Sequence, residues 1–311
     1  MIEIPLSLEA VCGCVPSTVV DNRALLTELV GPAKADAIVK STGFPFRRVV
    51  APGCTVYDLA LPAARSALEG IEPATLGGIV AVSFSAPERF PALAIRLHHA
   101  LGLLANAAAL DLSLACSGYP YGLFAAAQLA AATGRRVLLV DGDVQSTHVD
   151  TSDVNTLAVM SDAATATLLV PGGEPASFAF LTDGAGADIL RCGSDGRIRM
   201  DGFGVFRFVA GPVSQFLKEA CAAAPTPPSL FIPHQANMYM VRQLAKSLGL
   251  ESRLRTSGER FANPGSCSVP LTLAATEGTG RALLASFGAG LSAAAAFVDI
   301  PSTLRRSLAE A

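Results

Sequence analysis

Short apolar runs alternate with longer segments rich in alanine and leucine along most of this chain. The short runs predict strands at residues 78–83, 110–115, 136–140, 165–170 and 229–233. The longer segments predict helices at residues 121–132, 237–248 and 270–277. This alternation is typical of an α/β protein whose sheets are buried on both faces. Stretches rich in proline or glycine, at residues 222–228 and 183–196, predict surface loops rather than domain linkers.

An internal echo suggests that the α/β unit is duplicated. Cys116-Ser117-Gly118 precedes an alanine-rich helix, then Thr133-Gly134-Arg135 and an apolar run. About half a chain later, Asn263-Pro264-Gly265-Ser266 precedes a similar helix, then Thr279-Gly280-Arg281 and another apolar run. A repeat of this period suggests two halves related by a pseudo-twofold axis. We place these halves at residues 1–165 and 166–311.

The composition narrows the class of protein. The 311 residues are 51% hydrophobic and 16% charged, with a formal net charge of -3, which favours a globular chain and argues against a nucleic-acid or membrane binder. We find no apolar run of membrane-spanning length and no positively charged start before Arg23, so we expect a cytoplasmic protein. Seven cysteines without a repeated spacing then predict buried small side chains, one reactive thiol and no metal site.

Cys116 is the candidate for that reactive thiol. It follows the predicted strand at 110–115 and begins the turn into the predicted helix. The unpaired N–H groups and the positive dipole at a helix N-terminus favour a thiolate over a thiol. A packed, unreactive cysteine is the alternative interpretation.

Three further segments carry polar or flexible residues where a site is expected. His234, one of four histidines, follows the predicted strand at 229–233, and Gln235 and Asn237 flank it at a strand end, where α/β sites lie. Asn263 precedes a predicted helix and alone would be read as a helix cap. Phe287-Gly288-Ala289-Gly290 predicts a flexible loop whose amides can approach a carbonyl, although a simple turn explains it equally well.

Together these segments resemble the thiolase-fold condensing enzymes, and among them the β-ketoacyl-acyl-carrier-protein synthase III family. The resemblance is carried by Ala115-Cys116-Ser117-Gly118-Tyr119, Pro233-His234-Gln235-Ala236-Asn237, Asn263-Pro264-Gly265-Ser266 and Phe287-Gly288-Ala289-Gly290. It implies a five-layer αβαβα fold of two similar halves and a homodimer. It also implies that no cofactor is needed, because coenzyme A or phosphopantetheine enters as part of the substrates.

The resemblance also implies roles for individual residues. Cys116 takes an acyl group from an acyl-CoA or acyl-carrier primer, and the amides of Cys116 and Ala289 form the oxyanion hole. His234 and Asn263 bind the thioester oxygen of malonyl-carrier protein as it loses CO₂ and becomes an enolate. An asparagine at position 263 can donate to that oxygen, whereas a carboxylate would repel it. The implied product is a β-ketoacyl thioester for fatty-acid or polyketide-like biosynthesis.

Substrate and carrier contacts follow from the same resemblance. Phe90 would project from the partner subunit into the acyl pocket, and Asn237 would support the region of His234. The other expected substrate-binding residues are Phe203, Arg207 and Phe287. Arg242 and Lys246, four residues apart on a predicted helix, are candidates to dock an acidic carrier protein, with Arg253 and Arg255 extending the patch. A solvated helix face is the alternative interpretation.

The sequence departs from the family at the expected coenzyme A contacts. Ala37 and Ser41 stand where the family has the tryptophan and arginine that clamp adenine, and the chain has no tryptophan. Tyr239 replaces an arginine that helps to bind carrier protein or phosphopantetheine. The resemblance therefore leaves the primer and its carrier open.

Three other functions remain possible on the sequence. An acyltransferase would use the same Cys116 and His234 but pass the acyl group to an alcohol or amine. A papain-like hydrolase has the same order of cysteine, histidine and asparagine, although its aromatic signature near the nucleophile is absent. A non-catalytic partner subunit is disfavoured because all three polar residues are intact.

Overall fold

The computed structural model describes all 311 residues and is built around one long, bent sheet. Its strands run in the order β10-β11-β12-β7-β6-β4-β5, and β1 pairs with both β7 and β13. The bounds are β1 Ile2–Val15, β4 Leu76–Val82, β5 Ala108–Leu112, β6 Arg136–Val144, β7 Asp162–Thr182, β10 Leu230–Pro233, β11 Gly280–Gly288, β12 Ser292–Ile300 and β13 Arg305–Glu310.

Strand β7 joins the two halves of this sheet. Its residues 162–169 pair with β6, and its residues 177–182 pair with β12. Between them, Pro171 pairs with Leu6 and Pro175 with Pro5, so three extra residues bulge out of β7. Such a bulge bends a strand and increases its twist. The expected boundary between residues 165 and 166 lies inside β7.

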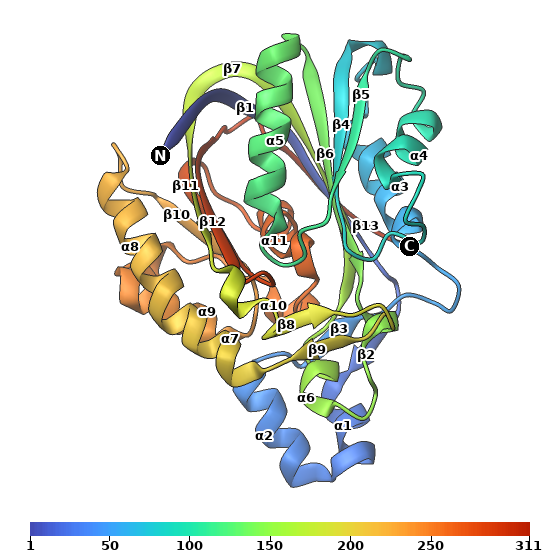
Figure 1. The fold of residues 1–311 in the computed structure, drawn as a ribbon, viewed down its shortest axis with the longest axis vertical. Coiled ribbons are helices and arrows are strands. Elements are labelled where there is room, and N and C mark those ends of the chain that lie inside the picture. The colour runs from blue at the N-terminus through green and yellow to red at the C-terminus, as the bar shows by residue number, and fades with distance from the viewer.

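Helices cover both faces of each half-sheet, which produces the five-layer thiolase arrangement (Figure 1). One outer layer holds α3 (Val56–Ala67) and α4 (Leu93–Ala100), and the other holds α8 (Ser214–Ala223) and α9 (Met238–Leu248). The middle layer holds α5 (Gly118–Thr133) and α11 (Ser268–Ala275). Side chains of α5, α11 and both half-sheets form one buried cluster of 26 residues.

The middle helices are apolar on nearly all sides because both of their faces meet a sheet. In α5, Tyr119, Leu123 and Ala126 are fully buried. Gly122 lets this helix approach β4 closely, because a Cβ atom there would lie 2.6 Å from Val82 Cγ2.

Smaller elements surround the lower end of the sheet (Figure 1). They are β2 (Val19–Asp21), α1 (Asn22–Val30), α2 (Pro32–Thr42), β3 (Phe46–Arg48), α6 (Val154–Leu157), β8 (Leu190–Cys192), β9 (Ile198–Met200), α7 (Gly202–Phe208) and α10 (Gly258–Phe261). No helix of the structure has the length and apolarity needed to cross a bilayer.

The predicted α/β class is confirmed, and each predicted strand and helix overlaps an observed one. Four local expectations are wrong. The strand predicted at 110–115 ends at Leu112, because the next five residues form the turn into α5. The loop predicted at 183–196 contains β8, and that at 222–228 begins within α8. Phe287 and Gly288 belong to β11 rather than to a flexible loop.

Candidate active site

Three polar side chains from distant parts of the chain line one cavity, which we call the reaction cavity. Cys116 lies in the turn between β5 and α5, His234 directly follows β10, and Asn263 follows α10. The other side chains around them are largely apolar: Val159, Met160, Leu190, Met200, Val205, Ala236, Met240 and Phe287. The arrangement places a thiol, an imidazole and an amide in a space with few competing polar groups.

Burial, rather than the helix dipole, dominates the environment of Cys116. The turn places it just before Ser117, the N-cap of α5, as expected. However, desolvation raises the pKa of the thiol to about 12, and the nearby charge of Asp143 acts in the same direction. The expected preference for the thiolate is therefore wrong for the resting protein. Cys116 is therefore a thiol at neutral pH.

Gly288 lies directly against the nucleophile. A Cβ atom at this position would be 2.6 Å from Cys116 Cβ, closer than non-bonded carbon atoms approach. The end of β11 can therefore pack on the Cys116 turn only if residue 288 has no side chain. The sequence shows a Phe-Gly pair here, but the need for glycine appears only when both segments are placed.

Two backbone amides beside Cys116 are free to bind an anion. The N–H groups of Cys116 and Ala289 donate no hydrogen bond to another residue. Both residues line a second cavity of about 200 Å³, the side cavity, which shares Cys116, Met160 and Leu190 with the reaction cavity. Two unpaired donors next to a nucleophile are the arrangement that stabilises a tetrahedral oxyanion.

His234 is buried and neutral. Desolvation lowers the pKa of its imidazole to about 3. The ring packs edge-to-face with that of Phe287, with 5.4 Å between the two ring centroids. Nδ1 lies 2.6 Å from Ser268 Oγ, which also accepts a hydrogen bond from the Gln235 N–H. The Ser268 hydroxyl can donate to Nδ1 or accept from it, so either tautomer of His234 is available.

Asn263 presents an N–H donor to the reaction cavity. Its Oδ1 accepts a hydrogen bond from the Gly265 N–H at 3.0 Å, while Nδ2 donates to no protein atom. Its main chain is fixed as well, because its N–H donates to the Val159 carbonyl and its carbonyl accepts from the Ser161 N–H. The Asn263 side chain is therefore held in one orientation, and its Nδ2 is free to donate a hydrogen bond.

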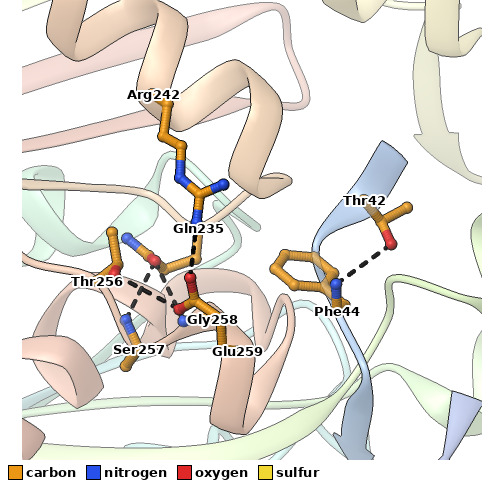
Figure 2. Close-up of polar contacts among 8 residues, drawn as sticks. All are labelled: Thr42, Phe44, Gln235, Arg242, Thr256, Ser257, Gly258 and Glu259. Carbon is orange, nitrogen blue, oxygen red and sulfur yellow. Dashed lines mark hydrogen bonds and ion pairs between the residues drawn. The ribbon is translucent and has the colours of Figure 1, made fainter. Parts of the chain in front are cut away.

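Two glutamines hold the segments that carry His234 and Asn263. Gln145 Nε2 donates to the carbonyls of Asn263 at 2.7 Å and Ser161 at 3.0 Å. Gln235 Oε1 accepts from the N–H groups of Ser257 and Gly258, which begin α10 and lead to Asn263 (Figure 2). The sequence motif drew attention to Gln235, but nothing in the local sequence marked Gln145.

Asp143 connects this network to β4. It accepts hydrogen bonds from Phe84 N–H at 3.0 Å and from the hydroxyl of Ser266 at 3.0 Å. Burial raises its pKa to about 6, and these hydrogen bonds oppose the rise. Because Ser266 lies in the loop after Asn263, Asp143 ties that loop to the end of the strand beside the side cavity.

The expected substrate contacts divide into two groups. Phe287 and Asn237 line the reaction cavity, and the Asn237 side chain also caps α9 by accepting from the Met240 N–H. Phe203 and Arg207 are exposed on α7 and line neither the reaction cavity nor the side cavity. Phe90 lies in the loop before α4 and is 84% exposed.

The four cations expected to dock a carrier are not equivalent. Arg242 and Lys246 are exposed on α9, and Arg242 forms an ion pair of 3.1 Å with Glu259 (Figure 2). Arg253 donates to the Pro228 carbonyl and Arg255 to its neighbour's carbonyl, so both are partly engaged within the chain.

A wide entrance cavity of about 510 Å³ lies beside the reaction cavity and shares Asn237, Met240 and Gly202 with it. Arg242 lines this entrance together with Lys40, which the sequence did not single out. Two cationic side chains, Lys40 and Arg242, therefore line the entrance cavity.

Comparison with known proteins agrees with this geometry. Sequence profiles of 3-oxoacyl-[acyl-carrier-protein (ACP)] synthase III and of its C-terminal part match residues 110–184 and 222–300. A β-ketoacyl-[acyl-carrier-protein] synthase III of Streptomyces coelicolor is 34% identical to this chain, covering 89% of this chain and 88% of that protein. The corresponding enzyme of a Roseiflexus species is 30% identical, covering 91% and 95%.

The fold shows the same relationship. A 3-oxoacyl-(acyl-carrier protein) synthase of Burkholderia xenovorans superposes with a TM-score of 0.94 at 28% identity, covering 99% of this chain and 98% of that one. A priming β-ketosynthase of a polyketide pathway superposes with a TM-score of 0.87 at 28% identity, covering 96% and 97%. The chain therefore belongs to the β-ketoacyl-acyl-carrier-protein synthase III family of thiolase-fold condensing enzymes.

Proposed function

We propose that the protein loads an acyl group on Cys116 and condenses it with a malonyl-carrier-protein extender. In the loading step, the sulfur attacks the primer thioester and its proton passes to Nε2 of His234. The oxyanion that forms accepts hydrogen bonds from the N–H groups of Cys116 and Ala289. The carbonyl is restored as the primer thiolate leaves and takes the proton from His234.

In the condensation step, malonyl thioester loses CO₂, and the electrons of the broken C–C bond form an enolate. In the other tautomer of His234, in which Ser268 donates to Nδ1 and the proton is on Nε2, His234 Nε2–H and Asn263 Nδ2–H donate to the enolate oxygen. The enolate carbon attacks the acyl group on Cys116, so a C–C bond forms and the C–S bond breaks. The Cys116 thiolate leaves and takes a proton from water, and a β-ketoacyl thioester is released.

One observation supports this reaction above the alternatives. Two separate pairs of unused donors surround a single thiol: two backbone amides, and the side chains of His234 and Asn263. A reaction that passes through two different oxyanions needs two such pairs, whereas simple acyl transfer or hydrolysis needs one.

The other functions fit the site less well. In a papain-like hydrolase the asparagine orients the histidine, but here His234 is bonded to Ser268 and Asn263 to Gly265. Transfer to an alcohol or amine passes through oxyanions at a single carbonyl and leaves the second pair of donors, His234 and Asn263, without a role.

The proposed partners are a second copy of the chain and an acyl carrier protein. The exposed Phe90 supports a homodimer in which it closes the partner's acyl site. Arg242 and Lys246, near the entrance cavity, support docking of an acidic carrier. Seven unpaired cysteines suit a reducing compartment, so we place the reaction in the cytoplasm. We also divide the duplicated fold into residues 1–165, with the nucleophile, and 166–311, with His234 and Asn263.

Intact-mass spectrometry tests the loading step. The protein is incubated with acyl-CoA and acyl-carrier thioesters of different chain length, and we expect a mass gain of one acyl group that is absent from Cys116→Ala. If no thioester acylates the protein, or if the gain persists in Cys116→Ala, the proposed nucleophile is wrong.

Release of CO₂ from malonyl-carrier protein tests the condensation step. Asn263→Asp replaces a donor with an anion of equal size, so we expect normal acylation of Cys116 and a loss of CO₂ release of about 100-fold or more. Full CO₂ release by Asn263→Asp would show that Asn263 does not bind the enolate.

A further inference from the structure

The side cavity extends from Cys116 along largely apolar walls. Apart from Cys116, the polar side chains along it are those of Ser113, Gln145, Arg191 and Cys192. Among the polar ones, Ser113 is exposed and the Arg191 side chain is 48% exposed and lies 3.5 Å from Asp188. Gln145 differs from both, because it is only 1% exposed.

The orientation of the Gln145 amide follows from its neighbours. Its Nε2 lies at 2.7 Å from the carbonyl oxygen of Asn263 and at 3.0 Å from that of Ser161, and both of these groups can only accept. The nitrogen must therefore face them. Oε1, on the other side of the amide, accepts no hydrogen bond from any protein donor.

Oε1 is not one of the fully enclosed side-chain atoms that lack a partner, so it keeps access to open space, and a bound molecule that excludes water would leave it unpaired. Gln145 lines the cavity that begins at the nucleophile, so a molecule bound there can supply the missing donor. An ordinary acyl chain has no donor to offer and leaves the oxygen unsatisfied. A site with a buried polar group of this kind discriminates against ligands that cannot pair with it.

We propose that Gln145 Oε1 accepts a hydrogen bond from a hydroxyl group on the acyl chain carried by Cys116, so that the preferred primers are hydroxyacyl thioesters. The inference rests on the proposed loading of Cys116. The oxygen occupies one place on the cavity wall, so it selects one position of the hydroxyl group and one of its two configurations. Gln145 is thereby a specificity-determining residue.

The test compares matched thioesters by the rate of Cys116 acylation, measured as intact mass against time. Butyryl-CoA is compared with both enantiomers of 2-hydroxybutyryl-CoA and 3-hydroxybutyryl-CoA, and hexanoyl-CoA with its 2- and 3-hydroxy analogues. We expect one hydroxyacyl isomer to exceed its unsubstituted parent about tenfold in kcat/KM, as one additional hydrogen bond provides.

Two variants separate the acceptor from the rest of the side chain. Gln145→Met fills the same space without an acceptor, and we expect the hydroxyacyl isomer and its unsubstituted parent to acylate this variant at about equal rates. Gln145→Glu keeps an acceptor while losing both N–H donors, so the preference should persist even if condensation slows. Met160→Leu, on the same cavity wall, is the matched control and should keep the wild-type preference.

The outcomes distinguish this inference from the proposed function. If Cys116 is acylated but no hydroxyacyl isomer is preferred, or if Gln145→Met retains the preference, the specificity assigned to Gln145 is wrong and the loading step stands. If no thioester acylates Cys116, the proposed function itself fails. The preference is a ratio within each variant, so partial loss of folded protein does not change it.

Discussion

At the scale of single residues, burial sets the protonation of the two groups that we propose exchange a proton. The pKa of Cys116 is raised to about 12 and that of His234 is lowered to about 3, so both are uncharged at neutral pH. An uncharged pair avoids the cost of burying an ion in the resting enzyme. The donors around them then act only on charge that develops during the reaction.

The lowered pKa of His234 makes the stability of the protein depend on pH. In the unfolded chain the imidazole binds a proton below about pH 6.5, whereas in the folded protein it stays neutral down to about pH 3. The unfolded state therefore binds more protons in this window, and the stabilisation present above pH 6.5 is lost as the pH falls. The contribution is at most about 1.4 kcal/mol per pH unit.

His234→Gln removes this contribution without adding a charge. We expect the free energy of unfolding of the variant to fall less steeply between pH 6.5 and pH 4.5 than that of the wild type, as measured by urea denaturation. His99→Gln, at an exposed position of α4, is the control for replacing a histidine elsewhere in the chain. Parallel curves for His234→Gln and the wild type would contradict the prediction.

Ala262, next to Asn263, has a backbone conformation that suits glycine. Its φ is 50° and its ψ is -134°, and the residue is fully buried. Backbone strain of this kind destabilises the folded protein by about 1–3 kcal/mol, and glycine would relieve it. Against this gain, losing the buried methyl group and increasing the conformational entropy of the unfolded chain together destabilise the protein by about 1–2 kcal/mol. We expect Ala262→Gly to be neutral or stabilising by up to about 1 kcal/mol.

Urea denaturation of Ala262→Gly and Ala63→Gly tests this. Ala63 is equally buried but lies within α3, so its replacement should destabilise by about 1 kcal/mol or more. A similar loss in both variants would mean that position 262 is not strained.

At the scale of secondary structure elements, the site depends on how chain ends are brought together. The turn after β5 carries Cys116, the end of β10 carries His234, and α10 leads to Asn263. Hydrogen bonds from Gln145 and to Gln235, and the contact of Gly288 with Cys116, hold these ends in place. Each of these contacts joins segments that are far apart in the sequence.

Gly288→Ala tests the closest of these contacts. The added Cβ would overlap Cys116 Cβ, which belongs to the backbone-proximal part of the residue and cannot swing aside. We expect the rate of Cys116 acylation to fall about tenfold or more, because small displacements of a nucleophile reduce its rate strongly. Gly211→Ala, where a Cβ meets no atom within 4 Å, should acylate at the wild-type rate. Equal rates in both variants would show that the turn can move.

At the scale of the whole molecule, Phe90 tests the proposed second subunit. Its side chain is 84% exposed in the single chain, and the homodimer proposed above would cover it. We expect the wild-type protein of 31.9 kDa to sediment as a dimer, and Phe90→Ser to raise the dimer dissociation constant about 10-fold to 100-fold.

Sedimentation velocity at several protein concentrations measures this change. Leu29→Ser, which removes an exposed apolar side chain from α1, is the control for a general change of surface polarity. A monomeric wild type at micromolar concentration would contradict the prediction.

The sequence by itself determined the fold class, the family and the three polar residues that meet in the reaction cavity. Alternating apolar runs predict strands and helices because local periodicity reports which faces are buried. Cys116, His234 and Asn263 stand in short motifs that are recognisable without knowing their surroundings.

Only the tertiary structure decided the properties that depend on distant neighbours. The neutral state of Cys116 and His234 comes from burial by residues throughout the chain, and it reversed the thiolate expected from the helix N-terminus alone. The orientation of the Gln145 amide is another such property. Its Nε2 donates to the carbonyls of Ser161 and Asn263, which leaves Oε1 without a partner, and Asn263 is more than a hundred residues away in the sequence. Desolvation and hydrogen-bond partners are set by packing between distant segments, which local sequence patterns do not encode.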